Sequence, residues 1–528
     1  MKRKIHRCFL SLILIFAVLL IHLGTIINND SFLSVGLNQS TRTALIATSR
    51  GTIYDRNGAP LINATTQFRG ALVPELEQLY RIRGDITEQE YLRLTNEIKQ
   101  QSLLVAELSK ASYSGQKLCT FSIPKRYDTS VPCAHLIGYL DESGLAGQAG
   151  IEKAYNDLLE QYSGKITVTY GVNGTGACQT DQSLEVNNTI DRCNGGVTLT
   201  IDAEIQQLLD HLAPQHIAKG AAVILSPDTG EILACTSLPT FHPEQLQASI
   251  EEENGALINR LLARYDSGSV FKIITAAAAL EQGVPSDQTF PCTGEMMVEN
   301  TLFHCHQRLG HQELDMNEAF AQSCNLYFIQ LAQQIGGKAI LDAAKAFGLY
   351  DSIDLAEGLG APAALLPELS QLFPAALANL SFGQGELLIS PLHVAQLTAT
   401  VANGGVRITP SAVLGTIDAQ GNQTRREKGR GEPVLSNTTI AQLRWMMEQV
   451  VSDGTGTRAQ PSKAHAAGKT GTAETGQLNG FAPVVQSWFT GYYPAENPKY
   501  VITILAEDAQ NNNGDAQALF RELCEKLY

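Results

Sequence analysis

A chain of 528 residues, of which 44% are hydrophobic and 17% charged, is too long for one ordinary core and should divide into two or more globular domains. The formal net charge of −15 argues against binding a nucleic-acid backbone as the main task, because such partners usually select a basic face. The composition therefore predicts a folded, multidomain chain with no nucleic-acid partner.

The first thirty residues predict a membrane anchor. Basic residues at 2–4 and Arg7 precede a mainly apolar run over 8–27, about the 20 residues that a helix needs to cross the hydrocarbon core. A cleaved signal peptide is the alternative, but the run is long for one and no small-x-small cleavage site follows. We expect residues 1–28 to form a cytoplasmic tail and a single-pass anchor in the cytoplasmic (inner) membrane, with the remaining chain outside the cell membrane.

After the anchor, residues 29–195 are expected to form a mixed, non-catalytic pedestal domain. Residues 50–61 suggest a strand and a turn, with Asn57-Gly58 as the turn signal, and 87–110 suggest a charged helix. Nothing in this part of the sequence gathers a nucleophile, a base and amide donors. It is therefore interpreted as a structural or docking domain.

Residues 196–528 are expected to form an α+β domain in which helices cover an antiparallel sheet. A strand over 197–201 leads into a helix that Asp202 would cap, and the runs 221–225 and 231–237 suggest a hairpin. Two further strands, at 487–493 and 499–506, flank a proline-containing turn near the end of the chain. The predicted helices between these strands cover 269–282, 317–335, 337–347, 391–402 and 438–451.

The chain has ten cysteines, and nine of them lie beyond the anchor. If that compartment is oxidising, three short-range pairs are candidate disulfides, although sequence alone does not fix the connectivity. The pairs are Cys119 with Cys133, Cys178 with Cys193, and Cys292 with Cys305.

The cluster His304, Cys305, His306 and His311 invites a metal interpretation. No second half with zinc-finger spacing accompanies it, so the sequence favours a disulfide or a plain loop there. No metal and no cofactor are expected.

A candidate nucleophile is Ser269, which is followed three residues later by Lys272. Serine needs a base within hydrogen-bond reach, and a lysine at this spacing provides one only on a helix. The same spacing recurs at Ser114 and at Ser122, but a glycine and a proline respectively disfavour a helix there. Only Ser269 opens an alanine-rich run, where the free N–H groups of a helix start would favour an alkoxide.

Two further tripeptides follow in order. Ser323-Cys324-Asn325 offers a hydroxyl that can relay a proton and an amide that can bind a peptide bond. Lys469-Thr470-Gly471, with Thr472 directly after it, would place a cation and hydroxyls on an exposed strand, where Gly471 lets a substrate approach the backbone. Each tripeptide alone would be read as an ordinary turn or helix, but the ordered set is not readily explained that way.

The set Ser-x-x-Lys, Ser-x-Asn and Lys-Thr-Gly is that of penicillin-binding proteins and serine β-lactamases. Much of the rest resembles the class B penicillin-binding proteins, from the anchor to the final strands. The matching segments are RGTIYDRNGAPL at 50–61, HLIGYL at 135–140, GQAGIEKAYNDLL at 147–159, LTIDAEIQQLL at 199–209, FGQGELLISPLHVA at 382–395, GTGTRA at 454–459 and AAGKTGTAE at 466–474. One departure is Ser267, where the family usually has proline.

The resemblance implies a peptidoglycan D,D-transpeptidase that β-lactams inhibit. Ser269 would attack the penultimate D-Ala carbonyl of a stem peptide and release the last D-Ala, and an amine of a neighbouring stem would then take the acyl group. Lys272 would accept the serine proton, and Ser323 and Lys469 would pass a proton to the leaving amine.

The resemblance also implies the binding roles. Asn325 would hold the donor amide, Thr470 and Thr472 would bind the terminal carboxylate, and the backbone N–H groups of Ser269 and Thr472 would form the oxyanion hole.

Two alternatives stay open at this stage. The same residues serve D,D-carboxypeptidases and β-lactamases, which transfer the acyl group to water, and a non-catalytic scaffold of division or elongation is the other possibility. Because only about 165 residues separate the anchor from the catalytic domain, a polymerising glycosyltransferase is expected to be a separate membrane partner.

Overall fold

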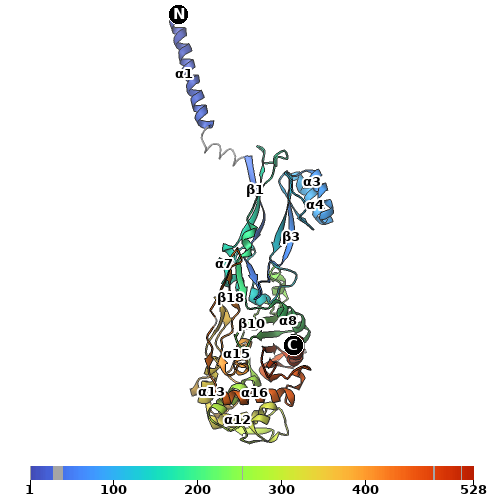
Figure 1. Ribbon diagram of the computed structural model, residues 1–528, viewed down its shortest axis with the longest axis vertical. Coiled ribbons are helices and arrows are strands. Elements are labelled where there is room, and N and C mark those ends of the chain that lie inside the picture. The colour runs from blue at the N-terminus through green and yellow to red at the C-terminus, as the bar shows by residue number, and fades with distance from the viewer. Residues whose placement is uncertain (1, 28–39, 253, 428, 480–481, 513) are drawn as a thin grey trace. The chain divides into compact units, whose positions relative to one another are not determined.

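The computed structural model (Figure 1) describes residues 2–27, 40–252, 254–427, 429–479, 482–512 and 514–528. The chain divides into two compact units. The first contains Met1–Arg50, Asn63–Arg126 and Tyr162–Cys193, and the second contains Gly51–Ile62, Tyr127–Gln161 and Asn194–Tyr528. The boundary expected at 195 lies where the chain enters the second unit for the last time, but residues 51–62 and 127–161 of the expected pedestal also pack with that unit.

The N-terminal helix α1 covers Lys2–Ile27. Its segment Lys4–Thr25 has a mean hydropathy of 2.5 and is long and apolar enough to cross a membrane. Its apolar side chains are exposed, as on a helix that would face lipid.

The first unit contains two three-stranded antiparallel sheets. One has the order β1-β6-β7 and the other β4-β3-β5. Their strands are β1 (Thr41–Ser49), β6 (Gly164–Gly171), β7 (Glu185–Asn188), β3 (Thr65–Leu72), β4 (Leu104–Leu108) and β5 (Leu118–Lys125). Besides α1, the α-helices described in this unit are α3 (Leu76–Arg81) and α4 (Glu88–Glu97).

The helix predicted over 87–110 is too long. Thr87 caps α4 by accepting a hydrogen bond from the N–H of Glu90, as the sequence suggests, but the helix ends at Glu97. A short 3-10 turn follows, and Gln101 then adopts a left-handed φ of 53°. This conformation turns the chain into β4, whose side chains are alternately buried and partly exposed.

The second unit is built on a five-stranded antiparallel sheet with the order β10-β9-β23-β22-β21. The strands are β9 (Gly220–Leu225), β10 (Ile232–Leu238), β21 (Ala467–Asn479), β22 (Ala482–Tyr493) and β23 (Tyr500–Ala506). The predicted hairpin and the predicted pair of C-terminal strands are thus confirmed.

Helices cover both faces of this sheet. Along β9, Val223 belongs to one hydrophobic core and its neighbours Ala222 and Ile224 belong to another, as the two-residue period of a strand requires. The first core includes α10 (Lys272–Glu281), α12 (Asn325–Ile335), α13 (Gly337–Ala346) and α15 (Pro391–Ala402). The second core includes α8 (Ala203–His216) and α18 (Ala516–Leu527), while α16 (Asn437–Ser452) contributes to both. The expected α+β architecture is confirmed (Figure 1).

Smaller elements complete the second unit. Among the described residues, a four-stranded sheet has the order β19-β18-β8-β2, and eight further strands form four two-stranded ribbons. Their strands are β2 (Thr52–Tyr54), β8 (Gly196–Leu199), β11 (Phe290–Cys292), β12 (Glu295–Val298), β13 (Thr301–His304), β14 (Gln312–Leu314), β15 (Ile353–Ala356), β16 (Leu359–Ala361), β17 (Val406–Arg407), β18 (Val413–Ile417), β19 (Gln423–Arg425) and β20 (Glu432–Pro433). The short helices are α5 (Ala134–Ile137), α6 (Gly150–Ala154), α7 (Asn156–Gln161), α9 (Leu246–Glu251), α11 (Met316–Ala321), α14 (Pro374–Ser381) and α17 (Ala509–Asn512).

All ten cysteines lie among the described residues, and all ten are free thiols. None of the three candidate disulfides is therefore formed in this structure.

Candidate active site

Ser269 lies on the opening turn of a helix, as the sequence predicts. Residues Gly268–Phe271 form a 3-10 turn that continues directly into α10, whose first residue is Lys272. In a 3-10 turn the side chains at positions i and i+3 lie on the same side, so the turn directs Ser269 and Lys272 the same way. The competing Ser122 lies in strand β5, and Ser114 lies in a bridge outside any helix.

The turn that carries Ser269 packs closely against strand β21. Gly268 has a left-handed φ of 53°, and a Cβ there would lie 2.4 Å from the carbonyl oxygen of Thr472. On the strand, a Cβ at Gly471 would lie 3.0 Å from the carbonyl oxygen of Ser267. Two glycines thus allow backbone to meet backbone, which places Ser269 beside the residues of the Lys-Thr-Gly segment.

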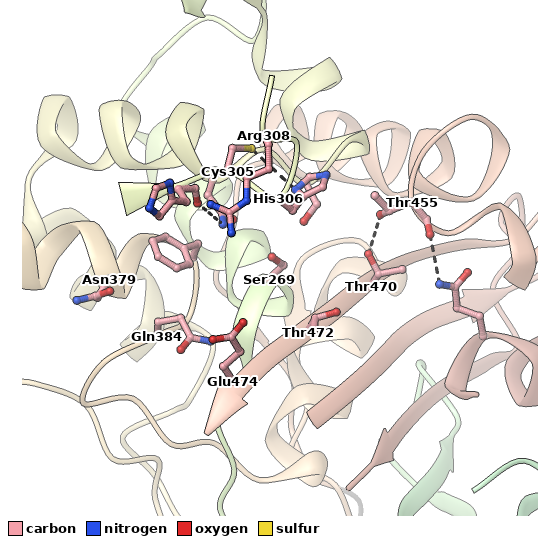
Figure 2. Close-up of a pocket in the computed structure, with 15 residues that line it drawn as sticks. Ser269, Cys305, His306, Arg308, Asn379, Gln384, Thr455, Thr470, Thr472 and Glu474 are labelled. Carbon is pink, nitrogen blue, oxygen red and sulfur yellow. Dashed lines mark hydrogen bonds between the residues drawn. The ribbon is translucent and has the colours of Figure 1, made fainter. Parts of the chain in front are cut away.

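Ser269 opens into a cleft of about 720 Å³. Figure 2 shows it between the loop that carries Cys305 and Arg308 and the strand that carries Thr470 and Thr472. The cleft is lined by Ser269, His304, Cys305, His306, Arg308, Ser323, Asn325, Asn379, Phe382, Gln384, Thr455, Thr470, Thr472, Glu474 and Gln517. Five of the eight predicted site residues therefore line one cavity, and Lys272, Lys469 and Gly471 lie behind it.

Two buried lysines meet at the hydroxyl of Ser323. Lys469 Nζ lies 3.0 Å from Ser323 Oγ, and Lys272 Nζ lies 3.3 Å from the same atom. Lys272 also donates to the carbonyl oxygen of Ser323, at 2.6 Å, and to Asn325 Oδ1, at 2.8 Å. The three predicted segments are thus joined through one hydroxyl.

Burial makes both amines weaker bases than a lysine in water. Removal from solvent lowers the pKa of Lys272 to about 7, partly offset by the nearby sulfurs of Cys324 and Cys305. Removal from solvent also lowers the pKa of Lys469 well below its ordinary value, and the charge of Lys272 lowers it further. A large share of Lys272 is therefore uncharged near neutral pH and able to accept a proton.

Ser323 lies in a break between two helices, where the sequence predicts one continuous helix over 317–335. Helix α11 ends at Ala321 and α12 begins at Asn325. Between them Ser323 takes a left-handed φ of 54°, which is uncommon for a residue other than glycine. With the helix broken here, Ser323 and Asn325 both contact Lys272.

Thr470 forms a hydrogen bond with Thr455, a residue that is not among the predicted site residues. Its Oγ1 lies 2.7 Å from Thr455 Oγ1, so the GTGTRA segment contributes a wall of the cleft (Figure 2). Gln384 and Glu474 also line the cleft. These three residues lie inside segments that carry the family resemblance, which was the available signal for them.

Four potential metal ligands gather beside the cleft, and one of them, Cys305, also lines it. They are Cys292, Cys305, His311 and Cys324, whose ligand atoms all lie within 4.8 Å of one another. The sequence suggests a pairing of Cys292 with Cys305 and a cluster that contains Cys305 and His311, but nothing in it connects these residues to Cys324, the middle residue of the Ser-x-Asn segment.

Residues 220–525 match the family described as the penicillin-binding protein transpeptidase domain. The chain belongs to this family. The family interpretation of the sequence is thereby confirmed, and the second unit contains a transpeptidase domain.

The sequence similarity to known proteins extends beyond the transpeptidase domain. The chain is 31% identical to penicillin-binding protein PbpB of Mycolicibacterium smegmatis over 434 residues, which is 76% of this chain and 64% of that protein. It is 26% identical to stage V sporulation protein D of Bacillus subtilis over 537 residues, which is 94% of this chain and 80% of that protein. Thus the chain spans slightly less than two thirds of the first relative and four fifths of the second.

A solved structure has a similar fold over most of this chain. A crystal structure of the D,D-transpeptidase domain of a peptidoglycan glycosyltransferase from Eggerthella lenta superposes with a TM-score of 0.64 at 26% identity. The superposition covers 91% of this chain and 98% of that one.

Proposed function

We propose that this penicillin-binding protein is a peptidoglycan D,D-transpeptidase that cross-links stem peptides through an acyl-enzyme on Ser269. The observation that carries the proposal is the pair of buried lysines on either side of Ser323, in the wall of the cleft into which Ser269 opens.

Acylation begins with proton transfer from Ser269 to the uncharged amine of Lys272. The serine oxygen bonds to the penultimate D-Ala carbonyl carbon, and the oxyanion is held by the backbone N–H groups of Ser269 and Thr472. When the bond to the last D-Ala breaks, Ser323 and Lys469 deliver a proton to the leaving nitrogen. An acceptor amine then attacks the ester and loses its proton to the same relay, and as the ester bond breaks Lys272 returns its proton to the oxygen of Ser269.

The remaining predicted residues bind the donor peptide. Asn325 would donate its amide group to the donor backbone, since its Oδ1 already accepts from Lys272. Thr470 and Thr472 would bind the terminal carboxylate with their hydroxyls, while Gly471 keeps the strand narrow behind them. β-Lactams would acylate Ser269 by taking the place of this donor.

The test is covalent labelling with a fluorescent penicillin, followed by denaturing electrophoresis. Ser269→Ala should abolish labelling, whereas Ser122→Ala, an exposed serine with the same spacing to a lysine, should leave it unchanged. Labelling of Ser269→Ala at the normal level would refute the nucleophile.

The acceptor is tested separately. A pentapeptide ending in D-Ala-D-Ala, supplied with a D-amino acid as acceptor amine, should yield the exchanged peptide in mass spectrometry. Hydrolysed tetrapeptide alone would indicate a D,D-carboxypeptidase, and rapid release of the penicilloyl group would indicate a β-lactamase. Normal wall growth with Ser269→Ala in place of the native chain would favour a scaffold.

The proposed location rests on α1, and the proposed partner on the short region between the anchor and the catalytic domain. We propose that this helix anchors the chain once in the cytoplasmic membrane, with its basic start inside and the transpeptidase domain outside. Strand polymerisation would then come from a separate membrane glycosyltransferase, which co-purification from cross-linked membranes would detect.

A further inference from the structure

The hydroxyl of Thr470 has one hydrogen-bond partner among the described residues, the hydroxyl of Thr455. The two Oγ1 atoms lie 2.7 Å apart, a usual distance for an O–H···O bond, and both residues line the cleft (Figure 2). Thr455 comes from the loop that follows α16. Whatever fixes Thr455 therefore also fixes a hydroxyl that faces the substrate.

Thr455 is held through its main chain on both sides. Its N–H donates to the carbonyl oxygen of Ala321, the last residue of α11, at 3.1 Å. Its carbonyl oxygen accepts from Nε2 of Gln517, a residue of α18, at 3.3 Å. A Cβ at Gly454 would lie 2.4 Å from the same Ala321 oxygen, so only glycine lets the loop approach α11 this closely. The loop is thus fastened to two helices that are distant from it in sequence.

The direction of the bond between the two hydroxyls decides whether Thr470 can bind an anion, because a hydroxyl has one hydrogen to donate. If Thr470 donated to Thr455, it would present only lone pairs to a carboxylate and would repel it. If Thr455 donates to Thr470, the hydrogen of Thr470 stays available for the ligand. The two bonds then form a chain in which each strengthens the other.

The other acceptor within reach of the Thr455 hydroxyl is a poor one. The carbonyl oxygen of Ala321 lies 3.5 Å from Thr455 Oγ1, which is long for an O–H···O bond. The same oxygen already accepts from the N–H of Thr455. The hydrogen of Thr455 is therefore better placed toward Thr470, and Thr470 is left as the donor that faces the cleft.

We propose that Thr455 is a positioning residue for carboxylate recognition. Its hydroxyl donates to Thr470 Oγ1 and so directs the hydrogen of Thr470 toward the terminal carboxylate of the donor peptide. This inference rests on the proposed function, in which Thr470 binds that carboxylate. Gln517 contributes by holding the carbonyl group of Thr455. Without the Thr455 hydroxyl, the Thr470 hydroxyl would rotate more freely, and ordering it when the ligand binds would cost free energy.

A test must separate this role from general damage to the cleft. Thr455 contacts Ala321, which precedes Ser323 by two residues, so a change at Thr455 could also displace the proton relay. A displaced relay would slow acylation by every ligand alike. Loss of a carboxylate contact would slow only those ligands that carry a carboxylate.

The experiment compares acylation by benzylpenicillin with acylation by its methyl ester, which lacks the negative charge. Both rates are measured on the full chain in detergent, by competition with a fluorescent penicillin. The native protein should react faster with the free acid. Thr455→Val should reduce this preference about fivefold, whereas Thr455→Ser, which retains a hydroxyl, should keep it to within about twofold. Because the preference is a ratio of two rates, it does not depend on the fraction of folded protein.

The matched control is Thr457→Val. Thr457 is an exposed threonine of the same segment and is not among the residues that line the cleft, so this change should leave the preference for the free acid unaltered. If Thr455→Val does not fold, Gln517→Met replaces it, because this change removes the donor to the carbonyl group of Thr455. The preference should then fall about twofold or more.

Two results would overturn the positioning role while the proposed function stands. One is an unchanged preference for the free acid in the folded variant, and the other is an equal slowing of the reactions with acid and ester. Native protein that reacts equally fast with both ligands would count against the carboxylate site of the proposed function, and the positioning role of Thr455 would be refuted with it.

Discussion

The amine of Lys272 has the environment of a general base. It is completely buried, donates to Ser323 and Asn325, and has its pKa lowered to about 7 by removal from water. Because a lysine accepts a proton only in its uncharged form, the base would be absent well below pH 7 and fully available above it.

Acylation by penicillin should therefore speed up as the pH rises through about 7 and then level off. The apparent midpoint belongs to the coupled pair of lysines, because Lys469 interacts with the charge of Lys272. The measurement is the second-order labelling rate between pH 5.5 and 9. Lys272→Arg should abolish labelling, since arginine stays charged throughout, whereas Lys125→Arg, three residues after Ser122, should keep it. A flat profile in the native protein would contradict the assignment.

At the scale of elements, the junction between the Ser269 turn and strand β21 depends on glycine. Gly268 needs both a left-handed backbone and room for the carbonyl group of Thr472. Gly283, at the end of α10, has a left-handed φ of 80° but open space around it. A comparison of substitutions at Gly268 and Gly283 therefore separates the free-energy cost of the left-handed conformation from that of the close contact.

Gly268→Ala should lower the free energy of unfolding by about 3 kcal/mol or more and abolish acylation, because a methyl group forces the turn away from the strand. Gly283→Ala should cost only about 1–2 kcal/mol, the usual penalty for a left-handed alanine. Urea unfolding of both variants measures the difference. Equal destabilisation would show that close packing at β21 is unimportant.

Elements with strong local signals could be predicted from the sequence. The helix after Asp202, the hairpin of β9 and β10 and the helix that begins near Ser269 all have capping, turn or alanine-rich patterns. The break at Ser323 could not be predicted, because no glycine or proline marks it. Lys272 donates to the carbonyl oxygen of Ser323 and Lys469 to its hydroxyl, so contacts distant in sequence override local preference there.

The same contrast between local signals and tertiary contacts decides which residues of the candidate site could be predicted. Ser269, Lys272, Ser323 and Lys469 could be named from the order of short motifs, since each motif carries its own chemistry. The cysteine cluster could be predicted only in part: the sequence pairs Cys292 with Cys305, but the proximity of Cys324 depends on the whole fold and not on zinc-finger spacing.

At the scale of the whole molecule, α1 differs from the second unit in where its apolar side chains lie. The helix exposes apolar side chains, whereas the second unit buries its own on both faces of a sheet. The chain should therefore separate with membranes only while α1 is present.

Deletion of residues 1–27 should release the protein into the soluble fraction without loss of penicillin labelling. Fractionation by ultracentrifugation, followed by labelling of both fractions, measures this. A matched variant that replaces the basic residues at 2–4 alone should remain with the membrane. Continued sedimentation of the deletion variant would show that another surface binds lipid.

Among the described residues, β21 pairs with β22 alone, so it is the edge strand of the sheet and its outer margin borders the cleft. An incoming peptide in an extended conformation could join that margin as one more strand, held mainly by its amide groups. Such docking would tolerate varied side chains but would be sensitive to the ligand's backbone. A donor methylated at a peptide nitrogen should then be excluded even when every side chain is preserved.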